Sequence, residues 1–362
     1  MKLSIGVALG LTQYALAEPI PPPTGQYNVG RRRHLIDFVN KCDPITPGGI
    51  STEYMVTLFY PTPDEPTEPT PYLEPELAEN YAGETWGLNI SHVTSTIPWD
   101  SSFLSELGPT LVFSPGAGGP PADGYTILFS ELASHGYVVA ALDHLYEMPF
   151  LRLPNGTSVY FNNIDPPDLN AYFAALHEVR VRELLHFIGY LPDLASELDA
   201  PLDTERLGTF GFSLGGSAAL TAAFHSDAVS AAINQDGSNW NLLNDTADSD
   251  LGKPSLLLGS SLHTEEMDPT WGKYYDWQTG WLRHFNVNYT GHVDWSDATY
   301  WKKWGTALPD VSLGSIDGER MAEITRVYTK AFFDEHLLGE EQPILDGESE
   351  EWPEVMFIYS NE

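Results

Sequence analysis

Apolar and polar positions along this chain follow two different periods. Residues 110–116 (TLVFSPG) and 137–143 (YVVAALD) are largely apolar runs, as is typical of strands buried on both faces of a parallel sheet. The intervening residues 125–135 repeat their apolar positions with the period of a helix. The pattern therefore predicts a strand–helix–strand unit in this region.

The same alternation continues along the rest of the chain. Further strands are predicted at residues 34–41, 54–61, 206–212, 229–237, 254–260 and 284–291, and further helices at 169–191, 214–226 and 319–338. Strands that alternate with helices form parallel sheets with right-handed crossovers. We therefore expect an α/β fold, with a mostly parallel, doubly wound sheet and helices on both faces.

Four segments divide the chain. Residues 1–17 hold a lysine, an apolar run too short to span a bilayer and a small-residue cleavage site, which is the pattern of a signal peptide. Residues 18–32 are predicted to form a Pro-rich leader, residues 33–345 a single α/β domain and residues 346–362 an acidic C-terminal tail. The acidic, proline-studded residues 61–76 are expected to form a loop that cannot pair in a sheet.

Charge excludes one class of partner. The chain has 51 acidic and 17 basic residues, a formal net charge of −34, so its surface repels nucleic acid and anionic lipid. The short basic run at residues 31–33 is interpreted as a solvated segment ahead of the first strand. We expect no nucleic-acid partner, and the sequence leaves the oligomeric state undefined.

Several features fit a secreted, extracellular protein. Beside the signal-like N-terminus, the sequons at Asn89, Asn155, Asn244 and Asn288 are candidate glycosylation sites. Cys42 is the sole cysteine, so the monomer has no disulfide, which a domain with a large apolar core tolerates.

A Gly-x-Ser-x-Gly motif carries the main chemical signal. It lies between the predicted strand at 206–212 and an Ala-rich helix. Gly211 and Gly215 permit a sharp strand-to-helix turn that lifts the Ser213 hydroxyl away from the backbone. This is the pattern of a nucleophile elbow, and it predicts that Ser213 is a nucleophile.

A nucleophilic serine needs a base at the carboxyl end of a later strand. The histidines beyond the elbow helix are His263, His284, His292 and His336. His284 opens a predicted strand and His336 lies on the last helix, whereas His292 directly follows the last predicted strand. We therefore select His292 as the base.

The orienting acid has two possible places. Asp236 ends the strand after the elbow helix, while Glu265, Glu266 and Asp268 follow the next strand, which is the more usual position in such sheets. An Asp-Gly pair after a strand is also a common turn. The residues by themselves leave these alternatives open.

Several motifs together resemble one known family, the secreted (plasma-type, group VII) platelet-activating factor acetylhydrolases, particularly the fungal members. The similar segments lie within residues 49–338 and read FSPGAGG, LASHGYVVAALDH, GFSLGG, INQDG and GHVDWSD. The resemblance implies an α/β-hydrolase domain and a triad of Ser213, Asp236 and His292, and it makes Asp236 the preferred acid.

The resemblance also implies an oxyanion hole made by the backbone N–H groups of Leu214 and Ala117. Two positions depart from the family pattern, because Phe212 and Pro115 stand where the family often has histidine. Both changes alter the wall near the acyl pocket and leave the catalytic groups in place.

Aromatic residues gather near His292. Six of the ten tryptophans lie in this region, at positions 271, 277, 281, 295, 301 and 304. They could line the acyl pocket, form a rim that contacts neutral lipid surfaces, or pack in the core, and the sequence leaves these alternatives open. Phe212, Trp240 and Trp295 are the candidate pocket residues.

The sequence therefore predicts a serine carboxylic ester hydrolase that acts on a lipid or small ester. The favoured reaction is hydrolysis of short sn-2 acyl esters of phospholipids, as in 1-alkyl-2-acetylglycerophosphocholine esterases. The alternatives are a broad carboxylesterase or cutinase-like polyester hydrolase, and a non-catalytic binding protein of the same fold. The reaction needs no cofactor and no metal; His263, Glu265 and Glu266 match no metal-ligand spacing and are expected to form an exposed polar loop.

Overall fold

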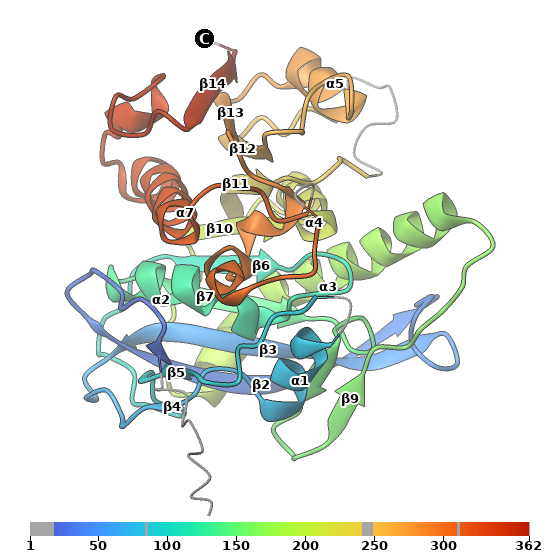
Figure 1. The fold of residues 1–362 in the computed structure, drawn as a ribbon, viewed down its shortest axis with the longest axis vertical. Helices are drawn as coiled ribbons and strands as arrows, with labels where there is room; N and C mark the ends of the chain where they lie inside the picture. Colours follow the sequence, from blue (N-terminus) through green and yellow to red (C-terminus); the bar gives the residue numbers. More distant parts are fainter. Residues whose placement is uncertain (1–17, 84–85, 241–248, 310–311, 362) are drawn as a thin grey trace, which may run out of the picture.

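A nine-stranded sheet forms the centre of the molecule, with the strand order β14-β13-β12-β11-β10-β6-β7-β3-β2 (Figure 1). The computed structural model describes residues 18–83, 86–240, 249–309 and 312–361, so the predicted signal peptide at 1–17 lies outside the described residues. Within these four ranges no helix is both long and apolar enough to cross a bilayer.

The central sheet combines parallel and antiparallel pairs. The strands from β7 to β13 in this order are parallel, whereas β2, β3 and β14 are antiparallel to their neighbours. The strands are β2 (Asn28–Lys41), β3 (Ile50–Thr62), β6 (Thr110–Ser114), β7 (Val138–Asp143), β10 (Leu207–Phe212), β11 (Val229–Gln235), β12 (Ser255–Ser260), β13 (Leu282–Val287) and β14 (Val355–Ser360).

Helices cover both faces of the sheet. The helices are α1 (Pro75–Ala82), α2 (Thr126–Ser134), α3 (Leu169–Glu197), α4 (Leu214–His225), α5 (Pro269–Trp277), α6 (Ala298–Trp301) and α7 (Gly318–Phe333). Apolar residues of α2 and α7 belong to one core cluster, and those of α3, α4 and α5 belong to a second. Strand β6 contributes side chains to both clusters, because Leu111 and Phe113 face the first and Val112 faces the second. The strand is therefore buried on both faces, which explains its run of apolar residues. The predicted α/β-hydrolase fold is confirmed.

Smaller strands lie outside the central sheet. A three-stranded sheet contains β1 (Glu18–Pro19), β5 (Val93–Ser95) and β4 (Thr70–Pro71), and a hairpin contains β8 (Phe150–Arg152) and β9 (Ser158–Tyr160). The prediction that residues 61–76 cannot pair in a sheet is therefore wrong at four positions, because β3 continues through Pro61 to Thr62 and β4 pairs antiparallel with β5. Proline is compatible with such short strands because they need few donated hydrogen bonds.

The predicted N-terminal boundary also needs correction. β2 begins at Asn28 rather than near residue 33, and the basic run at 31–33 forms part of it. Arg31 is 1% exposed, and Arg33 forms ion pairs with Asp123 and Glu74. The run is therefore not a solvated segment, because acidic partners from other parts of the chain neutralise its charge.

The predicted acidic tail is wrong for its last part. Residues 355–360 form β14, which pairs antiparallel with β13, and the Phe357 ring lies 5.3 Å from that of Phe285. This strand covers what would otherwise be an open edge of the sheet. Its acidic flanking residues hid it from a composition-based prediction.

Candidate active site

Ser213 occupies the turn between β10 and α4. It has φ 55° and ψ −126°, a strained conformation for a residue with a side chain. A Cβ atom on Gly211 would lie 2.4 Å from the carbonyl oxygen of Gly215, and one on Gly215 would lie 2.1 Å from that of Ser114. Only glycine fits at these two positions, so the predicted elbow geometry is present and it presents the Ser213 side chain at the carboxyl end of the sheet.

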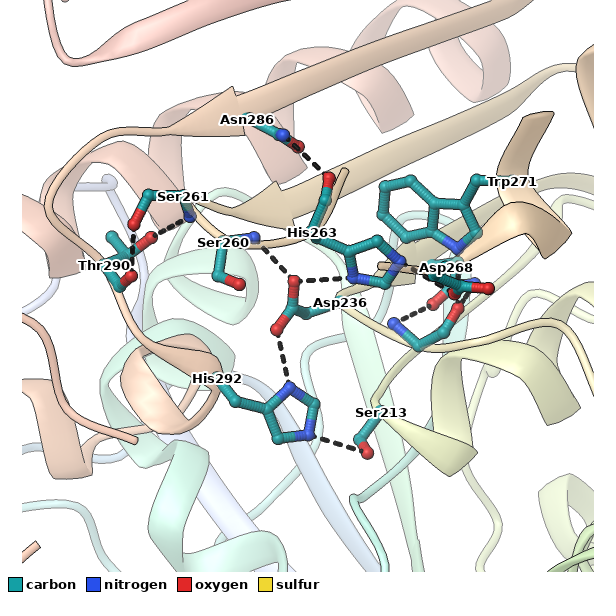
Figure 2. A network of polar contacts seen from close by, with 12 residues as sticks. Ser213, Asp236, Ser260, Ser261, His263, Asp268, Trp271, Asn286, Thr290 and His292 are labelled. Carbon is teal, nitrogen blue, oxygen red and sulfur yellow. Dashed lines mark hydrogen bonds and ion pairs between the residues drawn. The ribbon is translucent and has the colours of Figure 1, made fainter. Parts of the chain in front are cut away.

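His292 and Asp236 join Ser213 in one hydrogen-bonded row (Figure 2). His292 Nε2 lies 2.9 Å from Ser213 Oγ, and His292 Nδ1 lies 2.6 Å from Asp236 Oδ2. The three residues follow β10, β11 and β13, whose carboxyl ends share one edge of the sheet. The structure therefore brings together the nucleophile, base and acid that the sequence analysis selected.

The carboxylate of Asp236 is 4% exposed and accepts several hydrogen bonds. Burial alone would raise its pKa, but hydrogen bonds with His263 and His292 outweigh burial and hold the pKa well below its usual range. Asp236 is therefore ionised at neutral pH and accepts a hydrogen bond from the Nδ1–H group of His292.

The segment that carries His292 is fixed by a buried carboxylate. Asp294 Oδ2 accepts hydrogen bonds from the backbone N–H groups of Gly291 (2.7 Å) and Gly314 (2.6 Å). Its other oxygen lies 2.7 Å from Lys302 Nζ. The backbone on the N-terminal side of His292 is thereby held in place, while the imidazole itself remains 45% exposed and open to a substrate.

Phe212 lies beneath the imidazole. The two ring centroids are 4.7 Å apart, and Phe212 is 3% exposed. A Cβ atom on Gly116 would lie 2.7 Å from the Phe212 ring. Phe212 is thus packed between His292 and the turn after β6, and forms the floor of this region.

The two predicted oxyanion donors lie on adjacent segments. Ala117 packs against the same small apolar cluster that contains Leu214, and so does Trp240. A Cβ atom on Gly116 would lie 3.4 Å from that of Ser213, so the turn after β6 borders the nucleophile. Leu214 is the first residue of α4, where backbone N–H groups have no intrahelical partner and favour negative charge.

A buried arginine holds the turn after β6. Arg180, from the middle of α3, is 0% exposed and donates hydrogen bonds to the carbonyl oxygens of Pro115 and Gly116. Its charge is balanced by Glu147, to which it also donates. This ion pair therefore holds the backbone that carries Ala117.

A second buried pair lies at the base of the same turn. His144 Nδ1 is 2.5 Å from Glu183 Oε2, and its Nε2 is 3.2 Å from Ser114 Oγ. Burial raises the pKa of Glu183 to about 8 and lowers the pKa of His144 to about 3. At neutral pH the pair is therefore uncharged, with the carboxyl group donating to the imidazole.

The tryptophans near His292 are mostly packed inside the protein. Trp271, Trp295 and Trp301 are among the largest fully buried side chains, and Trp281 and Trp304 are partly buried against the core. Trp295 is 1% exposed, so it offers no surface to a substrate in this structure, whereas the partly buried Trp240 lies beside Leu214 and Ala117.

Other candidates lie away from Ser213. His284 is buried on β13 beside Tyr275, and His336 packs against Trp281. Glu265 and Glu266 are exposed to solvent.

The sequons differ in exposure. Asn89 and Asn155 are exposed and Asn288 is partly buried. Asn244 lies outside the described residues.

Sequence reasoning missed one site residue, His263. The expectation of an exposed polar loop is wrong for this side chain, which is 8% exposed. Its two ring nitrogens form hydrogen bonds with Asp236 and Asp268. Its position three residues after the end of β12, at the same edge of the sheet as Ser213, is the signal that could have identified it.

Comparison with known proteins extends these observations. The family described as "Platelet-activating factor acetylhydrolase, isoform II" matches residues 14–148, which include the turn after β6 and end before Ser213. A probable 1-alkyl-2-acetylglycerophosphocholine esterase of Arthroderma benhamiae is 26% identical over 94% of this chain and 93% of its own length. A platelet-activating factor acetylhydrolase of Canis lupus familiaris is 22% identical over 67% of this chain and 60% of its own length.

Among solved structures, a ferulic acid esterase from Streptomyces cinnamoneus superimposes with a TM-score of 0.81 and 28% identity, covering 95% of this chain and 100% of that one. Fold and relatives together identify the chain as a carboxylic ester hydrolase of the α/β-hydrolase class. The resemblance to the platelet-activating factor acetylhydrolase family that the motifs indicated is confirmed.

The Arg180–Glu147 pair leads to a prediction about stability. Arg180→Met leaves Glu147 buried without its counter-charge and is expected to lower the free energy of unfolding by about 3–5 kcal/mol. Glu147→Leu combined with Arg180→Met removes both charges and is expected to recover most of that loss. Urea denaturation of the two variants measures the difference; equal destabilisation in both would contradict the importance of the unpaired charge.

Proposed function

We propose that this protein is an exported serine esterase that removes short acyl groups from the sn-2 position of phospholipids resembling 1-alkyl-2-acetylglycerophosphocholine. The observation that carries the proposal is the row of contacts from Ser213 Oγ to His292 Nε2 (2.9 Å) and from His292 Nδ1 to Asp236 Oδ2 (2.6 Å). The similarity to the probable 1-alkyl-2-acetylglycerophosphocholine esterase of Arthroderma benhamiae supports the choice of substrate. Export rests on the signal-like residues 1–17 and on the sequons.

The proposed reaction begins with proton transfer. Ser213 Oγ attacks the ester carbonyl while its proton passes to His292 Nε2, and Asp236 stabilises the imidazolium that forms. The oxyanion of the tetrahedral intermediate accepts hydrogen bonds from the N–H groups of Leu214 and Ala117. Collapse of this intermediate transfers the Nε2 proton to the leaving alcohol and leaves an acyl group on Ser213.

The second half of the reaction reverses these roles. Water enters after the alcohol departs, and His292 Nε2 takes its proton as the oxygen attacks the acyl-enzyme. When the second tetrahedral intermediate collapses, the bond between the acyl carbon and Ser213 Oγ breaks, His292 Nε2 returns the proton to Oγ, and the carboxylic acid is released. No step uses a metal or a cofactor.

A second candidate is a broader carboxylesterase that acts on simple or polymeric esters, as a cutinase does. The structural similarity to a ferulic acid esterase over nearly the full chain favours this alternative. Both candidates use the same triad and differ in the shape of the acyl and alcohol sites. A binding protein without chemistry is disfavoured because each group of the triad is present and in contact.

We predict that Ser213 is the only residue labelled stoichiometrically by an organophosphonate. Ser213→Ala is expected to abolish labelling and to lower kcat by about 10⁴-fold or more, because the nucleophile is lost. Ser230→Ala, at an exposed position on β11, is the matched control and should leave both unchanged. An adduct found on another residue by mass spectrometry, or full activity of folded Ser213→Ala, would contradict the assignment.

We predict that Asp236→Asn keeps the fold and lowers kcat by about 10⁴-fold, because the amide favours the wrong tautomer of His292. Glu265→Gln, at an exposed position on the neighbouring loop, is the control and should have nearly normal kcat. Steady-state kinetics at pH 7.5 together with circular dichroism provide the measurement. A nearly normal kcat for Asp236→Asn together with a strongly reduced kcat for Glu265→Gln would show that the orienting acid lies on the loop after β12.

We predict that kcat/KM is highest for acetyl to butyryl esters and falls steeply for long acyl chains. Each accommodated methylene would contribute about 0.8 kcal/mol, so chain length is a sensitive measure of pocket depth. A phosphocholine with a short sn-2 acyl group is expected to exceed an aryl ester of equal acyl length, each relative to its uncatalysed rate. EDTA should leave the rates unchanged. Equal or faster turnover of long-chain or polymeric esters would favour the broader esterase instead.

A further inference from the structure

Both oxygens of the Asp236 carboxylate accept hydrogen bonds. Its Oδ2 faces His292, while its Oδ1 accepts hydrogen bonds from the backbone N–H of Ser260 at 2.6 Å and from His263 Nδ1 at 2.9 Å. The opposite nitrogen of that ring, His263 Nε2, lies 2.9 Å from Asp268 Oδ2. The row of contacts therefore continues past the triad to a second histidine and a second carboxylate (Figure 2).

The contacts of Asp268 favour its ionised form. Its Oδ1 accepts from the backbone N–H of Thr270 at 2.9 Å and faces the Thr270 hydroxyl at 2.6 Å, as the N-cap of α5. Its Oδ2 faces His263. These hydrogen bonds outweigh the effect of burial and lower the pKa of Asp268.

Two ionised carboxylates determine the protonation of His263. A carboxylate can only accept, so a ring nitrogen within hydrogen-bond distance of one must carry a proton. Both nitrogens of His263 meet this condition, one toward Asp236 and one toward Asp268, so the ring is an imidazolium. Burial alone would lower its pKa, but the hydrogen bonds and charges of the two carboxylates raise the pKa to about 9.

The surroundings of His263 fix the ring in this position. The ring stacks on Trp271, with centroids 3.7 Å apart and 25° between the planes, an arrangement that favours a cation. Trp271 is itself held by a hydrogen bond from its Nε1 to the carbonyl oxygen of Gly237 at 2.7 Å. Asn286 Nδ2 donates to the backbone carbonyl of His263 at 2.9 Å. The ring is therefore held by three segments: the loop after β11, α5 and β13.

His284 on β13, whose ring contacts Trp271 as the His263 ring does, is neutral. His284 Nε2 lies 2.6 Å from Asn286 Oδ1 and its Nδ1 lies 2.5 Å from the hydroxyl of Tyr275. With the amide oxygen as acceptor, Nε2 donates and Nδ1 accepts from the tyrosine, which is a neutral tautomer. Burial lowers the pKa of His284 to about 4, in agreement with this assignment.

The carboxylates in contact with the His263 ring both belong to the row itself. Asp236, His263 and Asp268 together carry one net negative charge, the same as the single aspartate of an ordinary triad. His292, on the far side of Asp236, becomes positive when it takes the proton of Ser213. Any change in the charge of His263 or Asp268 therefore changes the electrostatic potential at His292.

We propose that His263 is a positioning residue whose imidazolium, balanced by Asp268, holds Asp236 ionised and oriented toward His292. This inference rests on the proposed function. It adds to the triad a buried Asp–His pair that touches no substrate and acts through Asp236. The pair occupies the loop after β12, the place where many sheets of this type carry the acid itself.

Two substitutions should shift the proton affinity of His292 in opposite directions. His263→Gln removes a positive charge and should move the acidic limb of the kcat/KM profile to higher pH by about one unit. In Asp268→Asn the amide oxygen is expected to take the place of the oxygen that faces His263 Nε2, so that the ring keeps both protons, one negative charge is lost and the same limb should move to lower pH. Glu265→Gln, an exposed position on the same loop, is the matched control and should leave the limb in place.

The same variants separate positioning from substrate binding. His263→Gln should lower kcat by about 10-fold or more with little change in KM, because the residue orients a group and does not contact substrate. A structural role alone would lower stability without moving the pH profile in opposite directions. If His263→Gln fails to fold, Asp268→Asn still tests the proposal through its shift to lower pH.

A measurement independent of catalysis tests the protonation of His263. In ¹⁵N-histidine-labelled Ser213→Ala, both His263 nitrogens should show protonated chemical shifts at pH 7 and titrate near pH 9. Because this pKa lies above the unfolded value, the stability that His263 contributes is complete below about pH 6.5 and is lost as pH rises through about 9. Urea denaturation of the wild type and His263→Gln across this range should therefore give converging free energies of unfolding.

The outcomes distinguish the two proposals. Full activity of Ser213→Ala would overturn the proposed function, whereas the nuclear magnetic resonance titration would still report on His263. An inactive Ser213→Ala together with a neutral His263 at pH 7, or with acidic limbs that move in the same direction or stay in place, would overturn this inference alone.

Discussion

Most of the site depends on one constraint, the close approach of strand ends at the elbow. Gly211 and Gly215 allow the backbone to turn within van der Waals contact of Ser114, and the Ser213 N–H donates to Gln235 on the neighbouring strand. Because β10, β11, β12 and β13 are parallel neighbours, their following loops meet at the same edge. Ser213, Asp236, His263 and His292 are therefore brought together from four segments that are separated in the sequence but adjacent in the sheet.

Buried charges around this edge are compensated locally. Arg180 is paired with Glu147 and holds the carbonyl groups of the turn after β6, while Asp294 is paired with Lys302 and holds the segment that carries His292. An unpaired charge in such places would cost several kcal/mol. These contacts explain how a chain with a net charge of −34 keeps ionised groups inside its core, and they connect the stability of the core with the geometry of the site.

The chemistry and the substrate rest on different features. In the proposed reaction, ester hydrolysis depends on the contacts among Ser213, His292 and Asp236 and on two backbone donors next to them. The side chains beside these groups, such as Phe212 under the imidazole and Trp240 near Leu214, are the ones that we expect to set the choice of substrate. One fold can carry several activities, and this chain is similar both to a probable 1-alkyl-2-acetylglycerophosphocholine esterase and to a ferulic acid esterase.

The sequence by itself determined the features that depend on neighbours in the chain. The elbow around Ser213, the strands that are apolar on both faces and the placement of His292 after a strand follow from local periodicity and glycine spacing, whereas Asp236 needed the family resemblance to be preferred over later acids. Tertiary structure alone decided the rest. His263 is 27 residues from Asp236, and their contact exists because β11 and β12 pair in register. Likewise, residues 355–360 form strand β14 because they pair with the edge of β13. Arg31 is buried because it forms an ion pair with Asp123. In both cases the stabilising partner is far away in the sequence.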